Sequence, residues 1–177
     1  MTKPNIAVLA GEELFASFFD EPRKARLSRL ARWTLVSAEK CDAGLPPTLA
    51  GADALITTWD SPYLSAATMK ALPSVRIIAH CGGEVKKRFE KSLFGKLVIV
   101  NTPTPMAKPT AEMGAALLLY SARNIDHYRN ALRKRSNRIY QEVHLTGGGA
   151  ESLRGREVGM IGFGRTGRAL VELLRGF

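Results

Sequence analysis

Short apolar runs recur through the first hundred residues and alternate with segments whose apolar positions repeat at helical spacing. Runs of four to seven residues predict buried strands, and they span residues 5–10, 34–37, 52–58, 75–80 and 97–100. Helices are expected between them, at residues 12–19, 23–31, 64–72 and 85–94, with Ser65 as a candidate N-cap. This alternation is typical of an α/β fold with a flavodoxin-like, doubly wound parallel sheet and helices on both faces.

In open parallel sheets, ligands bind at the carboxyl ends of the strands. These ends carry residues 10–11, 58–60, 80–83 and 101–103. Trp59 and its neighbours either line a cleft or form a turn initiated by Asp60 and Pro62. His80 either contacts a substrate or is a hydrogen-bonded strand-end histidine. Cys81 is expected to serve packing, because no nearby base is evident.

The longest helical pattern follows the fifth strand, from Thr110 to about Lys134. Pro109 suits a first helical turn. Apolar residues on two faces predict a buried first half, whereas the basic residues from Arg123 onward predict an exposed second half. Residues 136–150 are expected to form a connector that ends in three glycines.

A glycine-rich segment near the end of the sequence lies between an apolar run and an amphipathic run. Residues 158–161 are expected to form a strand and residues 169–174 part of a helix, joined by Gly162-Phe163-Gly164-Arg165-Thr166-Gly167. In this G-x-G-x-x-G pattern the first glycine makes a tight turn, the second lets backbone approach a pyrophosphate, and the third allows close helix packing. The helix N-terminus adds free N–H groups. The pattern predicts a dinucleotide site; the alternative is a βα turn that binds nothing.

Dinucleotide folds continue with an acidic residue about 20 residues past the glycines, at the end of a second strand. The 177 residues stop at Phe177, before such a strand. We therefore expect the start of a dinucleotide-binding domain without its completion. Residues 152–177 are expected to be the least stable segment, because one strand and one helix bury little surface.

The charge, the cysteines and the apolar runs of the chain exclude several classes of binding partner and location. Two basic segments, residues 86–96 and 123–138, concentrate much of the positive charge in a chain of net charge +10. They lack the interleaved aromatic platform of a base-stacking surface, so no nucleic acid is expected. Cys41 and Cys81 have neither a disulfide-framework nor a metal-ligand spacing. Without an apolar run of 18 residues we expect no membrane span and a cytoplasmic location.

The order of these features is similar to that of a known family. A five-stranded α/β unit precedes Asn101-Thr102-Pro103, Thr110-Ala111-Glu112, a long helix and the glycine turn. This order resembles the D-isomer-specific 2-hydroxyacid dehydrogenases, a group that includes phosphoglycerate dehydrogenase-like enzymes. The resemblance implies a substrate-side domain over residues 1–103. Residues 104–177 would then hold an interdomain helix, a connector and an incomplete Rossmann domain. It also implies a homodimer that transfers hydride between NAD or NADP, with NAD favoured, and C2 of a 2-hydroxy or 2-keto acid.

Residue roles follow only from that resemblance. Residues 162–167 would hold the cofactor pyrophosphate, and Thr110 would approach the cofactor from the start of the interdomain helix. Gly82, Gly83 and Glu84 match a substrate loop whose backbone N–H groups hold the substrate carboxylate. The loop departs from the usual Gly-x-Gly-x-Asp-Asn, because Glu84 would bring negative charge that Lys86 offsets only if it points inward. The identity of the acid therefore stays open.

The Arg, His and acidic residue of the family's chemistry lie in its second half, so no catalytic residue is predicted here. The chain is accordingly expected to be inactive by itself, as a fragment of a longer enzyme. The alternative is a naturally shortened, non-catalytic binding or interaction module that uses the basic helix Arg123–Arg138 toward a partner. A receiver-like signalling domain fits the strand order but lacks an acidic cluster at its strand ends.

Overall fold

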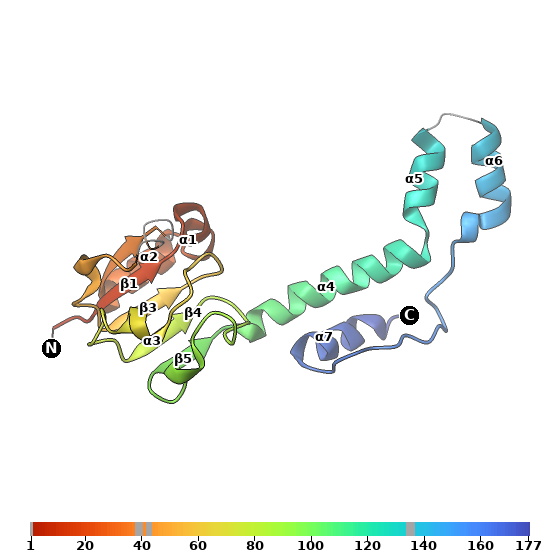
Figure 1. The fold of residues 1–177 in the computed structure, drawn as a ribbon. Helices are drawn as coiled ribbons and strands as arrows, with labels where there is room; N and C mark the ends of the chain where they lie inside the picture. The colour runs from red at the N-terminus through yellow and green to blue at the C-terminus, as the bar shows by residue number, and fades with distance from the viewer. Residues whose placement is uncertain (1, 38–40, 42–43, 134–136) are drawn as a thin grey trace. The chain divides into compact units, whose positions relative to one another are not determined.

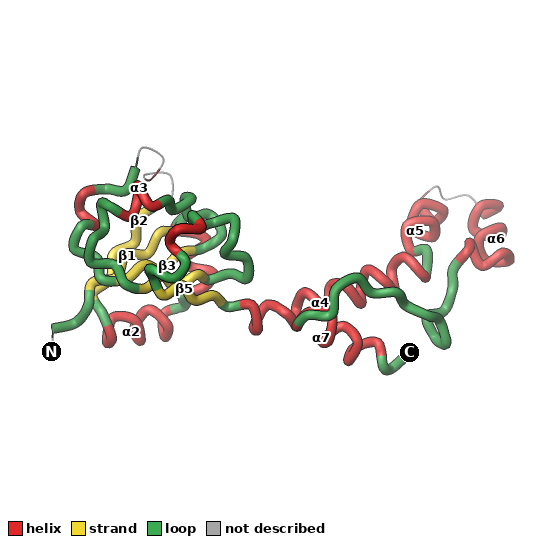
Figure 2. The backbone as a smooth tube through the Cα atoms, turned by 60° about the horizontal axis from the view of Figure 1, so that its bottom comes forward, coloured by secondary structure: helices red, strands yellow, loops and turns green. Residues whose placement is uncertain are grey.

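The computed structural model describes residues 2–37, 41, 44–133 and 137–177. The chain divides into two compact units, Met1–Pro103 and Thr104–Phe177. The strands all lie in the first unit, and the second unit is helical (Figure 2). Lys134, Arg135 and Ser136, which belong to the predicted basic segment and connector, lie outside the described residues. Within the described ranges, no helix is long and apolar enough to cross a membrane.

The first unit is built on a parallel sheet of five strands (Figure 1). The strands are β1 (Asn5–Leu9), β2 (Arg32–Val36), β3 (Ala54–Thr57), β4 (Ile77–His80) and β5 (Val98–Asn101). Their order, β2-β1-β3-β4-β5, is the flavodoxin-like arrangement and confirms the predicted fold class. The carboxyl ends stay in one register, since Leu9 pairs with Thr57, Thr57 with His80, and His80 with Asn101.

Two helices follow β1 directly, as predicted: α1 (Glu12–Phe18) and α2 (Glu21–Leu30). The helical conformation is interrupted at Asp20, the N-cap residue of α2, whose carboxylate accepts the Arg23 N–H at 2.9 Å. Pro22 then fits the first turn of α2, where its missing N–H costs nothing.

The remaining helical elements of this unit are short. α3 (Ala66–Met69) is shorter than predicted, but Ser65 caps it as expected by accepting the Thr68 N–H at 3.0 Å. Two 3-10 turns, η2 (Pro47–Leu49) and η3 (Lys91–Leu93), precede β3 and β5.

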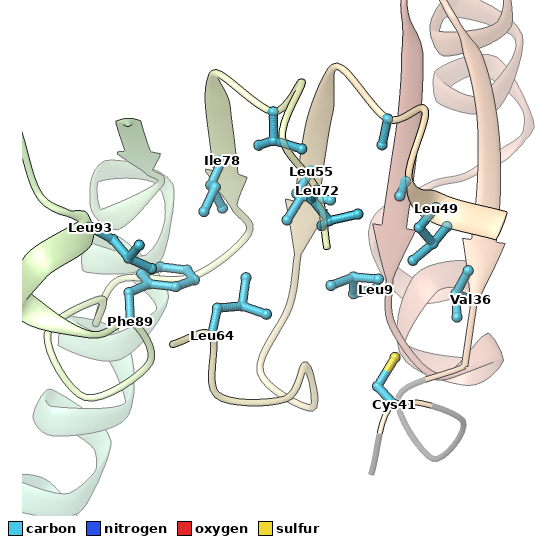
Figure 3. Packing of buried hydrophobic residues seen from close by; sticks show 13 residues of the cluster. Leu9, Val36, Cys41, Leu49, Leu55, Leu64, Leu72, Ile78, Phe89 and Leu93 are labelled. Atoms are coloured by element: carbon cyan, nitrogen blue, oxygen red, sulfur yellow. The ribbon is translucent and has the colours of Figure 1, made fainter. Parts of the chain in front are cut away.

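Apolar residues are buried on both faces of the sheet, because successive side chains of a strand point to opposite faces. The larger cluster includes Leu9, Leu55 and Ile78 (Figure 3). On the opposite face, Val8 packs with Phe15 of α1. The sheet, including its carboxyl edge, is therefore held by hydrophobic packing on both faces.

The basic segment 85–94 was predicted as a helix, and that prediction is wrong. It is a turn followed by η3. Phe89 is buried and forms a β-bridge with Leu64. The Leu64 N–H donates to the Arg88 carbonyl at 3.1 Å, and the Glu90 N–H donates to the Leu64 carbonyl at 2.9 Å. Burying one aromatic ring against a segment distant in sequence outweighs the favourable helix propensity of the lysines, which amounts to only tenths of a kcal/mol per residue.

The second unit consists of helices joined by turns. They are α4, α5 (Ile125–Arg133), α6 (Asn137–Thr146) and α7 (Arg165–Leu174), with the 3-10 turn η4 (Gly147–Gly149) before the segment that leads to α7. α6 lies where a connector was predicted. That prediction is wrong because Val143 is buried, and burial of an apolar residue stabilises a helix with a weak sequence pattern.

The predicted helix 110–134 is two helices. α4 (Pro103–Ala122) begins well before Thr110, so Pro109 lies inside it and not in its first turn. Prolines 103 and 105 stand in the first turn, where backbone N–H groups have no helical acceptor in any case. The helix ends because Asn124 adopts a φ of +48°, and its side-chain amide donates to the Gly148 carbonyl.

Two expectations about apolar segments of this unit are wrong. α4 buries only Ala107 and Ala111, whereas Met113, in the part before Arg123 that was predicted to be buried, is 61% exposed. Residues 158–161 do not form a strand. A strand requires a neighbour for its N–H and C=O groups, and no strand lies beside them in the described part of the chain. α7 packs on α4 instead, where Gly114 faces Leu170.

Candidate functional site

The turn after β3 is held together by its own polar side chains. The Asp60 carboxylate accepts the Gly11 N–H at 2.6 Å and the Thr58 hydroxyl. The Ser61 hydroxyl accepts the Thr58 N–H at 2.7 Å and donates to the Leu9 carbonyl of β1. A Cβ at Gly11 would lie 2.7 Å from Asp60 Oδ2, so glycine is required for this approach. Asp60 therefore builds a rigid turn at the carboxyl edge of the sheet.

His80 ends β4 and is 1% exposed. Its Nδ1 lies 3.0 Å from Thr57 Oγ1, and its ring meets Phe89 edge-on with centroids 5.9 Å apart. Within the described residues its Nε2 has no hydrogen-bond partner. Burial lowers the pKa of His80, the nearby Arg88 charge lowers it further, and the Glu84 charge raises it. The imidazole is therefore neutral at pH 7.

Cys81 follows His80 and connects the strand to the next loop. Its N–H donates to the Thr57 carbonyl at 2.8 Å, which extends the pairing of β4 with β3 by one residue. Burial raises the pKa of the Cys81 thiol, so the sulfur stays protonated near neutral pH. The described residues contain no group of His, Cys, Asp and Glu side chains that could hold a metal ion.

The loop Gly82–Gly83–Glu84 is fixed through its carbonyl groups. The Gly82 carbonyl accepts the Thr102 N–H at 2.9 Å, and the Gly83 carbonyl accepts the Asn101 side-chain amide at 2.7 Å. None of the three loop N–H groups donates a hydrogen bond to any residue that the structure describes. Successive backbone N–H groups bind an anion where they converge on one concavity. Sequence reasoning used Asn101 as a family marker and missed its role in holding this loop.

Gly82 lies in a space that admits no side chain. A Cβ at Gly82 would lie 2.5 Å from His80 Nε2 and 2.8 Å from Trp59 Nε1. The buried imidazole and the indole nitrogen therefore converge on the backbone of the loop. Trp59 and His80, for which a contact with a ligand was one of two alternatives, are thus brought together with Gly82, although they come from the ends of two different strands.

The Glu84 carboxylate is engaged by the turn that follows it. It accepts the Lys86 N–H at 2.7 Å and the Lys87 N–H at 3.2 Å. The negative charge of Glu84 is thus partly neutralised by backbone dipoles of its own turn. Compensation of this charge by Lys86 was conditional on an inward-pointing side chain, whereas these contacts come from main-chain N–H groups.

The glycine turn of the second unit joins residues 158–161, which form no strand, to α7. Gly162 has a φ of +92°, which suits glycine alone. A Cβ at Gly164 would meet nothing within 4 Å, so the backbone there is open to a ligand. A Cβ at Gly167 would lie 2.8 Å from the Gly162 carbonyl oxygen and 3.0 Å from Met160 Sδ, so the helix can pack closely only with glycine there. Residues 162–166 are exposed.

α7 begins at Arg165, directly after its N-cap residue Gly164, and no side chain caps this end. The first-turn N–H groups of Arg165, Thr166 and Gly167 are therefore available to an anion, and the helix dipole adds positive potential there. Phe163 is 61% exposed, and the Arg168 guanidinium lies 5.8 Å from its ring centroid. The turn thus presents an exposed backbone and an uncapped helix N-terminus.

Thr110 does not start the helix, contrary to the prediction that placed it there. It lies in the second turn of α4, and its hydroxyl donates to the Met106 carbonyl at 2.7 Å. The earlier start of α4 explains the difference, because residues 103–109 were not recognised as helical.

No family model matches the chain. It is similar to a glyoxylate reductase from Thermococcus kodakarensis, with 30% identity over 130 residues that span 71% of this chain and 38% of the relative. It also aligns with a phosphoglycerate oxidoreductase from Rhizobium etli at a TM-score of 0.65 and 30% identity, over 97% of this chain and 53% of that one.

A third similar structure is the NADPH-dependent glyoxylate/hydroxypyruvate reductase from Sinorhizobium meliloti in complex with NADP and malonate. It matches at a TM-score of 0.66 and 25% identity, over 99% of this chain and 51% of that one. The chain therefore spans about half or less of the length of the proteins it matches. Sequence and fold agree that the chain belongs with the D-isomer-specific 2-hydroxyacid dehydrogenases and corresponds to an N-terminal portion of them.

Proposed function

We propose that this chain is part of an NAD(P)-dependent oxidoreductase that acts on the CH–OH group of a 2-hydroxy acid or the carbonyl of a 2-keto acid. The observation that carries the proposal is the loop of residues 82–84, which offers three unpaired N–H groups at the carboxyl edge of the sheet. A substrate carboxylate accepts hydrogen bonds from these groups, and the bonds from Thr102 and Asn101 keep the loop in place.

The second part of the proposal concerns the cofactor. The backbone of residues 162–167 would hold the pyrophosphate of a nicotinamide dinucleotide, with Gly164 giving the closest approach. When bound, the nicotinamide supplies hydride exchange with C2 of the acid. The relatives' names support a nicotinamide cofactor, and NAD in preference to NADP stays a prediction, as do the cytoplasmic location and the homodimer.

We further propose that the 177-residue chain does not turn over by itself. The family's Arg, His and acidic residue have no assigned counterparts here, and His80 is buried with a lowered pKa. The imidazole is held by Thr57 at Nδ1 and packed on Phe89, and we assign it no role in proton transfer.

The test compares the protein purified from its source cells with the 177-residue chain. We expect the cellular protein to have an intact mass of roughly twice 19.3 kDa and to oxidise NADH or NADPH when a 2-keto acid is added. We expect the isolated chain to show no such oxidation. Oxidation by the isolated chain would contradict the proposed inactivity, and a cellular protein of that length without any 2-keto acid-dependent oxidation would contradict the enzyme proposal.

The second candidate function is a non-catalytic interaction module. It is favoured by the helices α5 and α6, which expose Leu132 and Leu145 by 57% and 82% beside a basic face. Arg129 of that face pairs with Asp126 at 3.1 Å, and both side chains are exposed. An intact cellular mass of 19.3 kDa would favour this module over the enzyme.

A further inference from the structure

Trp59 is an exposed aromatic residue on a rigid support. It lies two residues after the end of β3 and is 46% exposed. The residues after it are held in place, because Asp60 accepts the Gly11 N–H and Ser61 donates to the Leu9 carbonyl of β1. Tryptophan combines a large apolar ring with an N–H donor, and ligands of open parallel sheets bind at this edge.

The indole nitrogen of Trp59 lies against the loop that offers free N–H groups. A Cβ at Gly82 would be 2.8 Å from Trp59 Nε1. No residue in the described ranges accepts a hydrogen bond from this indole N–H. The other tryptophan differs, because the Trp33 indole N–H donates to Ser28 Oγ at 2.8 Å. Trp59 is thus the indole whose polar edge and ring both stay available beside the loop.

A second aromatic ring extends this surface. Phe18, at the end of α1, meets Trp59 edge-on with centroids 5.1 Å apart. Phe18 is half-buried, so α1 holds its ring in place. The two rings form one apolar surface, in which Trp59 lies next to Gly82 and Phe18 packs against Trp59.

We propose that Trp59 and Phe18 are specificity-determining residues that select a 2-hydroxy or 2-keto acid with an aromatic side chain. This inference rests on the proposed function, in which the N–H groups of residues 82–84 hold the acid's carboxylate. A phenyl group on the carbon next to C2 then lies on this apolar surface. An acid such as glycolate or glyoxylate, which has no carbon beyond C2, leaves both rings in water.

The test is a titration of the 177-residue chain followed by ¹⁵N-resolved NMR, with D-3-phenyllactate, D-lactate and glycolate as probes. The backbone amides of residues 82–84 report the carboxylate, and the Trp59 indole N–H reports the side chain. The Trp33 indole N–H is an internal control. We expect D-3-phenyllactate to bind about tenfold more tightly than D-lactate, because it buries a phenyl ring against an aromatic pair. We expect only D-3-phenyllactate to shift the Trp59 indole resonance.

Two variants separate the side-chain contact from the fold. Trp59→Ala should reduce the preference for D-3-phenyllactate to about twofold or less while leaving lactate binding unchanged. Leu30→Ala changes an apolar residue of α2 that is 64% exposed, and it should leave the preference intact.

The outcomes distinguish this inference from the proposed function. Equal affinity for the three acids, with shifts confined to residues 82–84, would overturn the aromatic preference and leave the carboxylate site standing. Shifts at neither the loop nor Trp59 with any of the acids would overturn both.

Discussion

Replacing Gly82 by alanine introduces one methyl group at the most crowded point of the candidate site. The new Cβ would lie 2.5 Å from His80 Nε2 and 2.8 Å from Trp59 Nε1, below the separation that real Cβ atoms show. Trp59 is exposed and can move, but His80 is 1% exposed and packed on Phe89. Overpacking against a side chain that cannot move costs about 1–3 kcal/mol. We expect the free energy of unfolding of the first unit to fall by that amount.

Guanidinium unfolding followed by tryptophan fluorescence measures this loss, since both tryptophans lie in the first unit. Gly51→Ala is the matched control, because a Cβ there meets nothing within 4 Å. It should be neutral, or stabilising by about 0.4–1 kcal/mol through the unfolded state. A Gly82→Ala variant within about 0.5 kcal/mol of the wild type would refute the reasoning, because the imidazole and the loop would then have room to separate.

Three further predictions follow from the same geometry. The pKa of His80 is lower in the folded chain than its ordinary value of 6.5. The stability that the neutral imidazole contributes is therefore present above pH 6.5 and is lost as the pH falls through the folded pKa. Urea midpoints at pH 7.5 and 5.5 should differ less in His80→Gln than in the wild type. A Cβ at Gly164 or at Gly176 meets nothing within 4 Å, so alanine at either position should leave the free energy of unfolding within about 0.5 kcal/mol. Gly164→Ala should weaken NADH binding by about tenfold or more, measured by NADH fluorescence, whereas the control Gly176→Ala should leave NADH binding unchanged. Hydrogen exchange should be fastest in residues 152–177, because α7 contains no buried residue; protection there equal to that of β1 and β3 would count against it.

Local sequence patterns were sufficient to predict most strands of the first unit. The five apolar runs become the five strands, because burial of apolar side chains on both faces of a sheet needs no information beyond the runs themselves. The cap at Ser65 was also readable from the sequence, because it bonds to an N–H only three residues away. The positive φ of Gly162 follows from its place in a short glycine pattern.

Contacts between distant residues decided the rest. Segment 85–94 lost its predicted helix because Phe89 pairs with Leu64, and the apolar run 158–161 forms no strand because the described residues supply no neighbouring strand. α4 starts earlier than predicted, at Pro103. Prolines break helices in their interior but are tolerated in the first turn, so the prolines before residue 110 did not indicate a helix start.

The candidate site shows the same division. Its glycines and the family resemblance were visible in the sequence, which determined the fold class and the chemistry to look for. Only the tertiary structure shows why Gly82 must lack a side chain, that Asn101 and Thr102 hold the loop carbonyls, and that Trp59 lies beside that loop. These residues come from the ends of three parallel strands. Their proximity depends on strand order and register, which are set by packing across the whole sheet.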